Sequence, residues 1–184
     1  MKVFLVYSAT NSLLSKSIKC YTKETYNHVS IAFDKNLDQT YSFGRKKIAN
    51  PLIGGFVKEN FWDPFFLTSE CLIYSLDVSV EQYEKMLEIV YYFDQNKQLF
   101  QYNFLGLIAL SFNYDFKREN AYFCSEFVAT LLNESNVTTF DKKIQFITPK
   151  DLLEIQHLEK IFEGQVVNYL SEDKTITNRP LSVV

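Results

Sequence analysis

The chain has 184 residues, of which 47% are apolar and 16% aromatic, so it can bury a substantial core and is not expected to be disordered. Acidic and basic residues are mixed and give a net charge of −3, which excludes a broad basic surface for nucleic acid. No segment has the roughly eighteen uninterrupted apolar residues that span a bilayer, and residues 1–16 lack the features of a secretory signal. We therefore expect a cytoplasmic protein, without a nucleic-acid partner, that forms one domain over residues 1–184.

The first part of the chain favours strands. Residues 2–8 are a short β-rich run, and apolar side chains at helical spacing predict a helix over residues 12–22. Apolar and polar residues then alternate over 28–34, which is typical of a strand with two faces. After a turn, residues 39–45 are expected to form the partner strand of a hairpin.

The middle of the chain combines turn residues with one apolar strand. Asn-Pro, Gly-Gly and Asp-Pro pairs predict that residues 46–69 are mostly loop, with an irregular strand near 55–58. Residues 71–78 are apolar and are expected to return to the sheet as a strand.

The second half favours helices. Ser79 and Gln82 have the spacing of a capping box and predict a helix that starts there. Its buried face is expected to carry Tyr83, Met86, Leu87, Val90 and Tyr91.

The segments that follow are shorter. The apolar stretch 103–112 is expected to be a buried helix, and residues 124–132 another helix. Thr148 precedes a proline and predicts a short capped helix over 148–155, and residues 158–170 are expected to form a hairpin that turns at Glu163-Gly164. The mixture of these elements predicts an α+β fold.

Cysteine and histidine are scarce. Cys20, Cys71 and Cys124 form no CxxC pair, so neither a disulfide framework nor a zinc knuckle is expected. The histidines are His28 and His157, and their surroundings show no metal-ligand spacing, so we expect no metal and no other cofactor. Cys20, in a predicted helix, and Cys71, at the start of a predicted strand, are interpreted as structural residues.

Cys124 has two possible roles. It is predicted to lie at a helix N-terminus, where the helix dipole and free backbone N–H groups stabilise a thiolate and could stabilise an oxyanion. The same position, between Phe123 and Phe127, also suits a small buried core residue. The local pattern leaves both roles open.

His28 is the better candidate for a base that could activate Cys124. It begins a predicted strand on the polar face, whereas His157 lies in a predicted surface segment. A third polar group usually orients such an imidazole, and the next strand offers several that depend on the register. These are Gln39, Thr40, Tyr41 and Ser42.

Several segments resemble the circularly permuted branch of the NlpC-type papain-like cysteine hydrolases, which includes lecithin retinol acyltransferase-like proteins. The resemblance extends from about residue 4 to about residue 169, and its sharpest signal is FCSEFV at the head of a helix. The histidine strand precedes the cysteine helix, which is the order of the permuted branch. The matching segments are YNHVSIAFD with YSFGRK, QYNFLGLI, and AYFCSEFVATLL with TPKDL.

The resemblance implies a permuted papain-like fold, with a central antiparallel sheet packed against helices that include the cysteine helix. It implies that Cys124 is the nucleophile, that His28 is the base and that Ser42 occupies the third position. It also implies oxyanion or substrate contacts from Tyr7 and from the backbone N–H of Ser125. The expected activity is a cysteine amidase, peptidase or acyltransferase that forms a thioester with a small amide, peptide or lipid-like acyl substrate.

Two alternatives follow from departures and additions in this sequence. A binding module without useful catalysis is suggested by the serine at the third position and by a predicted loop that could cover the groove. A membrane-surface lipid acyltransferase or phospholipase is suggested by the apolar residues 104–110, beside Phe112 and Phe116. The sequence leaves the oligomeric state open.

Overall fold

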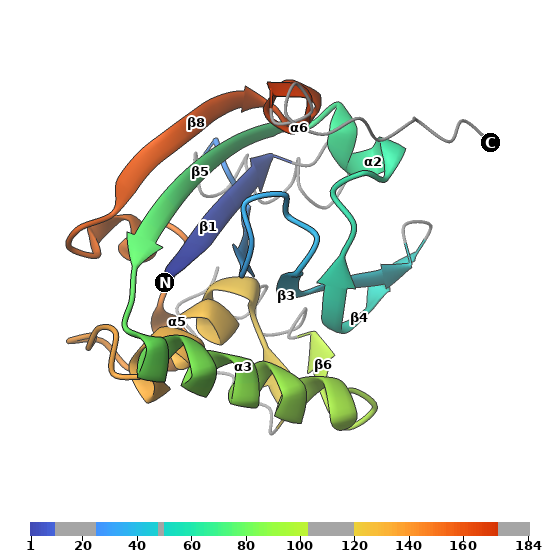
Figure 1. Cartoon of the computed structure of the whole chain (residues 1–184). Helices are drawn as coiled ribbons and strands as arrows, with labels where there is room; N and C mark the ends of the chain where they lie inside the picture. The colour runs from blue at the N-terminus through green and yellow to red at the C-terminus, as the bar shows by residue number, and fades with distance from the viewer. Residues whose placement is uncertain (10–24, 48–49, 103–119, 173–184) are drawn as a thin grey trace.

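In the part of the chain that the structure describes, six strands form one antiparallel sheet in the order β4-β3-β2-β1-β5-β8 (Figure 1). The structure is a computed structural model that describes residues 1–9, 25–47, 50–102 and 120–172. The strands are β1 (Lys2–Ala9), β2 (His28–Ala32), β3 (Thr40–Lys47), β4 (Asn50–Glu59), β5 (Glu70–Asp77) and β8 (Glu159–Gln165). A parallel pair, β6 (Gln101–Tyr102) and β7 (Ala121–Tyr122), lies outside this sheet.

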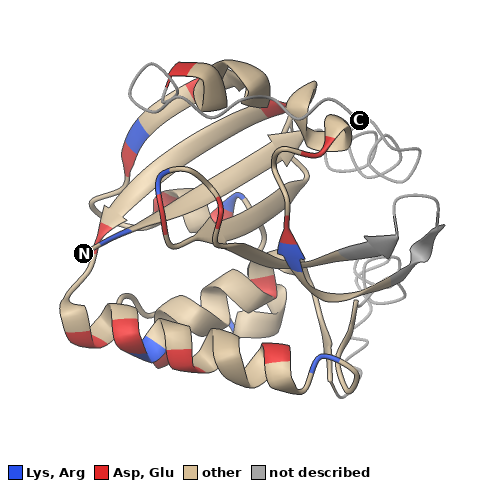
Figure 2. Ribbon diagram, turned by 45° about the vertical axis from the view of Figure 1, so that its right-hand side comes forward, with Lys and Arg blue, Asp and Glu red and all other residues tan. Residues whose placement is uncertain are grey.

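Helices pack on the two faces of the sheet, so the predicted α+β fold is confirmed. They are α2 (Pro64–Leu67), α3 (Val80–Gln95), α5 (Cys124–Glu134) and α6 (Val166–Glu172), with short 3-10 turns η1 (Ile144–Phe146) and η2 (Asp151–Glu154). Alternate residues of β1 face α3 and α5 on one side, including Leu5 and Tyr7. The others, including Phe4 and Val6, pack toward α2 and α6 on the opposite side (Figure 1). Acidic residues are frequent along α3, and charges of both signs are interspersed elsewhere (Figure 2).

Phe43 of β3 lies at the centre of the aromatic core. Its ring is fully buried, and five other rings have centroids between 4.9 and 6.3 Å from it. These rings come from β4, α3, the segment after α3, β7 and α5, so Phe43 ties the sheet to the helix layer. They belong to Phe56, Phe93, Phe100, Tyr122 and Phe127.

The start of α3 agrees with the sequence prediction, but part of its buried face does not. Ser79 and Gln82 form the predicted capping box. Tyr91 is 64% exposed, and Phe93 is buried in its place. The reason is helical geometry, because Phe93 continues the stripe of Met86 and Val90 toward the aromatic core, whereas Tyr91 lies about 100° around the helix from Val90.

The segment 46–69 is more regular than the prediction of a loop with an irregular strand near 55–58. That strand is present but longer, as β4, which pairs with β3, and α2 follows it. A β-carbon on Gly54 would lie 2.6 Å from Tyr102 Cβ and 2.8 Å from the Gly44 carbonyl oxygen. Glycine is therefore required here by close packing within a strand and not by a turn.

The predicted hairpin over residues 158–170 is wrong. The chain continues as β8 through Glu163 and Gly164, which pair with Leu72 and Cys71 of β5. It then enters α6, whose Val166 and Leu170 are buried against the second face of the sheet. Pairing with the edge of β5 outweighs the local turn tendency of the Glu-Gly pair.

Three other predictions concern less of the fold. The short helix predicted over 148–155 with Thr148 as its cap is present only as the 3-10 turn η2, whose N-cap is Lys150, although Thr148 and Asp151 exchange hydrogen bonds. The helices predicted over 12–22, which contains Cys20, and over 103–112 lie outside the described residues.

Gly54→Ala is expected to lower the free energy of unfolding by about 1–3 kcal/mol, because the added methyl group meets the Gly44 carbonyl and the Tyr102 side chain. Chemical denaturation would measure the change. An alanine without such a clash would raise stability slightly by restricting the unfolded chain. Unchanged or increased stability would therefore contradict the packing role of Gly54, and Glu84→Ala on the exposed face of α3 is the control.

Candidate active site

Cys124 is the first residue of α5, and His28 is the first residue of β2. Phe123 is the N-cap of α5 in extended conformation, and its N–H donates to the Glu126 carboxylate at 3.2 Å. Because α5 packs across β2, the start of the helix lies against the start of the strand. The two residues, 96 positions apart in the chain, are thereby brought close together, and the Cys124 thiol and the His28 imidazole each shift the pKa of the other.

The other side of the imidazole is held by Glu59, at the end of β4. The His28 Nε2 atom lies 2.7 Å from Glu59 Oε1, and both side chains are largely buried. Since Nε2 is engaged by the carboxylate, we infer that Nδ1 is the nitrogen that serves the Cys124 thiol. The three side chains form a chain of contacts from thiol to imidazole to carboxylate.

The electrostatics of this cluster favour a thiolate and an imidazolium. Burial alone would raise the pKa of Cys124, but the hydrogen bond and charge of His28, with the backbone N–H groups of Val29 and Ser125, lower it. Burial alone would lower the pKa of His28, but Glu59 and Cys124 raise it to about 10. Burial disfavours the ionised Glu59 carboxylate, yet His28 and two serine hydroxyls hold its pKa below the ordinary value.

Ser42 does not take the predicted place beside the imidazole. Its hydroxyl donates to Glu59 Oε1 at 2.8 Å, so Ser42 contacts the carboxylate and Glu59 orients His28. Among the alternatives, Thr40 donates to the Leu37 carbonyl at 2.9 Å, and Gln39 is exposed. Tyr41 lies on the opposite face of β3, where its ring stacks on Phe56.

Sequence reasoning missed Glu59 because it lies in a segment that was interpreted as loop. The signal that could have found it is strand register. Thr40 pairs with Ala32 on one side and with Glu59 on the other, so these residues share a face of the sheet. That face also carries His28, because His28 and Ala32 are four positions apart along β2 and side chains on a strand repeat every two residues.

Tyr7 and Ser125, predicted to contact an oxyanion or substrate, both lie near the sulfur. Tyr7 is buried, and its hydroxyl has no hydrogen-bond partner among the described residues. Burial, with Tyr74 and Cys124 nearby, raises its pKa, so the hydroxyl stays protonated and can donate. The Ser125 N–H contacts the Cys124 sulfur, whereas its side-chain hydroxyl donates to the Ile147 carbonyl at 2.6 Å.

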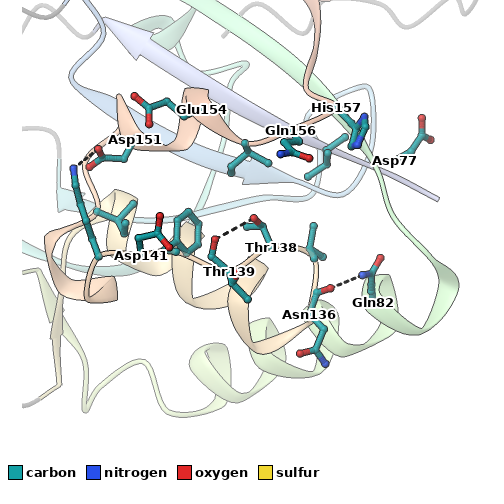
Figure 3. A pocket seen from close by; sticks show the side chains of 16 residues that line it. Asp77, Gln82, Asn136, Thr138, Thr139, Asp141, Asp151, Glu154, Gln156 and His157 are labelled. Carbon is teal, nitrogen blue, oxygen red and sulfur yellow. Dashed lines mark hydrogen bonds and ion pairs between the residues drawn. The ribbon is translucent and has the colours of Figure 1, made fainter.

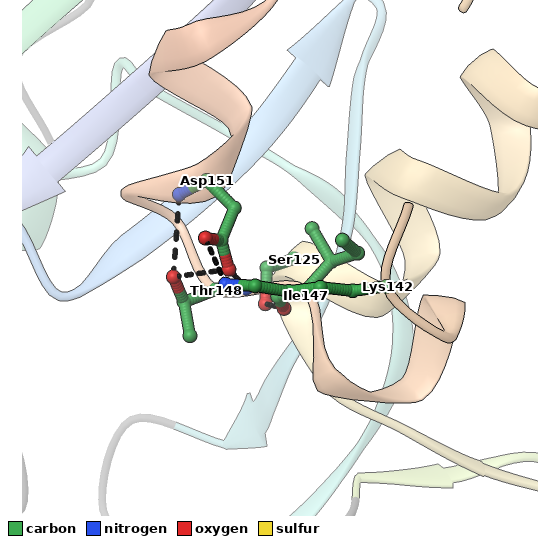
Figure 4. A network of polar contacts seen from close by, with 5 residues as sticks. All are labelled: Ser125, Lys142, Ile147, Thr148 and Asp151. Carbon is green, nitrogen blue, oxygen red and sulfur yellow. Dashed lines mark hydrogen bonds and ion pairs between the residues drawn. The ribbon is translucent and has the colours of Figure 1, made fainter. Parts of the chain in front are cut away.

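The segment that carries Ile147 is anchored by a polar network (Figure 4). Asp151 accepts hydrogen bonds from the Thr148 N–H at 2.9 Å and from its hydroxyl at 2.8 Å, and it pairs with Lys142. Together with the bond from Ser125, these contacts fix the chain beside the first turn of α5.

The same segment lines a cavity of about 760 Å³ (Figure 3). Its lining comes from the end of β5, the start of α3, residues 136–142 and residues 154–157. Ile147 lines it, and so does His157, whereas Cys124 and His28 do not. His157 is exposed, so the structure brings the two histidines to different places.

Cys71 and the acidic side chains outside the cluster bear on the structural-cysteine and metal predictions. Cys71 is a free, buried residue, and burial raises the pKa of its thiol to about 12, as expected of a structural cysteine. Within residues 1–9, 25–47, 50–102 and 120–172, no three His, Cys, Asp or Glu side chains are grouped so that they could hold a metal ion. In the same part of the chain, no helix is long and apolar enough to cross a membrane.

Comparisons with known proteins support the fold only. No protein-family profile matches the sequence, and no curated protein matches it. Among solved structures, the chain is similar to the crystal structure of metalloprotein yiiX from Escherichia coli O157:H7, a DUF1105 protein. The TM-score is 0.56 at 15% sequence identity, over 89% of this chain and 97% of that chain. The likeness thus concerns the whole arrangement of helices and sheet.

Proposed function

We propose that this protein is a cysteine hydrolase or acyltransferase that forms a thioester acyl-enzyme on Cys124. The observation that supports this proposal most strongly is the buried chain of contacts from Cys124 through His28 to Glu59. A nucleophile, a base and a group that orients the base are the three parts that covalent acyl transfer requires. A structural cysteine needs no base, and at Cys71 burial and the charge of Glu70 raise the pKa of the thiol to about 12.

The proposed reaction has two steps. The Cys124 thiolate attacks the carbonyl carbon of an amide, ester or thioester, and the leaving group takes a proton from the His28 imidazolium. His28 then accepts a proton from water or another acceptor, which attacks the thioester and releases the thiolate. In both steps the Tyr7 hydroxyl and the Ser125 N–H would donate to the oxyanion that forms on the carbonyl oxygen.

The resemblance to the permuted papain-like branch supports the same proposal. The histidine strand precedes the cysteine helix in the chain, and the two meet in space, which is the arrangement that this branch implies. A carboxylate on the imidazole is also compatible with that branch. We therefore propose an amide, peptide or lipid-like acyl compound as the substrate class.

The two alternative functions rest on different parts of the chain. The case for a non-catalytic module rests on Ser42 as the group beside His28 and on a loop that covers the groove. In the structure Glu59 contacts His28 instead, and residues 50–59 of the predicted loop form the strand β4. The lipid-surface alternative depends on residues 104–110, which lie outside the described residues. It stays a prediction, as does the cytoplasmic location.

An activated ester would test the proposal directly. Incubation with a p-nitrophenyl acyl ester is expected to add one acyl group to Cys124, detected by intact mass and peptide mapping. Cys124→Ala should remove the adduct, whereas Cys71→Ala, which replaces a buried free thiol outside the cluster, should keep it. Acylation that persists in Cys124→Ala, or that never occurs at Cys124, would refute the acyl-enzyme.

A further inference from the structure

Glu59 is surrounded by hydrogen-bond donors on both carboxylate oxygens. Oε1 lies 2.7 Å from His28 Nε2 and accepts the Ser42 hydroxyl at 2.8 Å, and Oε2 accepts the Ser30 hydroxyl. Ser30 and Ser42 are fully buried, and Glu59 is 9% exposed. Water therefore solvates this carboxylate poorly, and protein groups must stabilise its charge instead.

The arrangement of donors selects the ionised form of Glu59. A buried carboxyl group is ordinarily driven toward its neutral form, whereas hydrogen bonds donated to the carboxylate favour the charged form. The hydroxyls of Ser30 and Ser42 each have one O–H group to donate to the Glu59 carboxylate, and the Nε2–H of a protonated His28 donates to it as well. If Glu59 were protonated, its own O–H would point at one of these donors, and the hydrogen bond from that donor would be lost.

Gly44 lies against the side chains of Ser42, Glu59 and His28. Glu59 on β4 and His28 on β2 are separated in the sheet by β3, which carries Gly44. A β-carbon on Gly44 would lie 3.3 Å from Ser42 Oγ, 3.4 Å from Glu59 Oε1 and 3.6 Å from His28 Cε1. The carboxylate therefore crosses β3 at Gly44 to reach the imidazole, and there a β-carbon would be tight only against the Ser42 hydroxyl.

We infer that Ser30 and Ser42 are positioning residues that hold Glu59 ionised and aimed at His28, and so maintain the thiolate of Cys124. This inference rests on the proposed function, because it concerns the same cluster. Ser30 and Ser42 act through Glu59 and not on the substrate. Their removal makes the ionised form of Glu59 less stable, so the pKa of His28 falls. With less imidazolium beside it, the Cys124 thiolate loses part of its stabilisation.

The pH dependence of Cys124 alkylation tests this role. For the double variant Ser30→Ala with Ser42→Ala, the iodoacetamide rate at neutral pH is expected to fall about tenfold, since two hydrogen bonds to a charged group are lost. The acid limb of the profile should move to higher pH, because less thiolate is present. Peptide mapping separates Cys124 from Cys20 and Cys71.

Histidine NMR gives a second readout that a purely structural role would not move. With only two histidines in the chain, the ¹⁵N signals of His28 can be followed beside those of the exposed His157. The pH at which His28 loses its proton should fall in the serine variants, in the same direction as in Glu59→Gln. Ser75→Ala, at a buried serine of β5, is the matched control and should leave both readouts unchanged.

The outcomes separate this inference from the proposed function. Suppose that the wild-type protein shows a thiolate at low pH and that His28→Ala removes it. If the serine variants then keep the wild-type alkylation profile and His28 titration, the positioning role is wrong, while the proposed pairing of Cys124 with His28 is retained. If the wild-type thiol itself reacts slowly and without dependence on His28, the proposed function fails. Denaturation curves for each variant identify any loss of folding.

Discussion

Replacing His28 with alanine is expected to lower the alkylation rate of Cys124 at neutral pH on the order of a hundredfold. In the wild type, the imidazolium lowers the pKa of the thiol against the effect of burial. Without it, burial favours the neutral thiol, and an ordinary cysteine has only a few per cent thiolate at neutral pH. Stopped-flow alkylation across a pH series, with peptide mapping at Cys124, would measure the change.

The pH dependence of acyl transfer by the same cluster, measured as acylation of Cys124 by a p-nitrophenyl ester, has a definite sign. Because the pKa of His28 is raised to about 10, the imidazolium persists from acid to mildly alkaline pH and is lost as the pH rises through that value. Acyl transfer needs this proton for the leaving group, so its rate should decline above about pH 10. His157→Ala, at the exposed histidine, is the control. Equal loss of reactivity in both histidine variants would exclude a specific Cys124–His28 pair.

Phe43→Ala is expected to lower the free energy of unfolding by about 3–5 kcal/mol. The substitution removes a fully buried ring that contacts aromatic residues of β4, α3, β7 and α5. The surrounding rings are held by several elements, so they cannot all move inward to fill the space. Urea denaturation followed by far-UV circular dichroism would give the change in stability.

The matched control for Phe43 is Tyr91→Ala, which removes an aromatic ring that is 64% exposed on α3. Its effect should stay within about 0.5 kcal/mol. If the two variants lose similar stability, the aromatic cluster is not the main link between the sheet and the helices. Phe43 lies between Ser42 and Gly44, so a looser β3 should also slow Cys124 alkylation in the folded variant.

Several features could be predicted from the sequence because they depend on neighbours in the chain. The capping box at Ser79 and Gln82 is completed within a few residues, and it marks the start of α3. The helix that begins at Cys124 and the strand that begins at His28 likewise follow from local patterns of apolar and polar residues. The resemblance to the permuted papain-like branch, in which the histidine strand precedes the cysteine helix, then implied that the two form a pair.

Other features depend on contacts between distant segments. The Gly-Gly pair of β4 has the local pattern of a turn, but the close approach of Tyr102 and Gly44 makes glycine necessary within a strand. The Glu163-Gly164 pair has the same local pattern, yet pairing with β5 keeps it in β8. In both places the free energy of sheet pairing outweighs the turn preference of two residues.

The sequence by itself determined the nucleophile and base candidates, Cys124 and His28, because each has a recognisable position at the start of a regular element. Only the tertiary structure decided which residue orients the base. Strand register places Glu59 across β3 from His28 and turns Ser42 toward the carboxylate. Register is set by pairing along whole strands, and a shift of one residue would have turned Glu59 to the other face of the sheet.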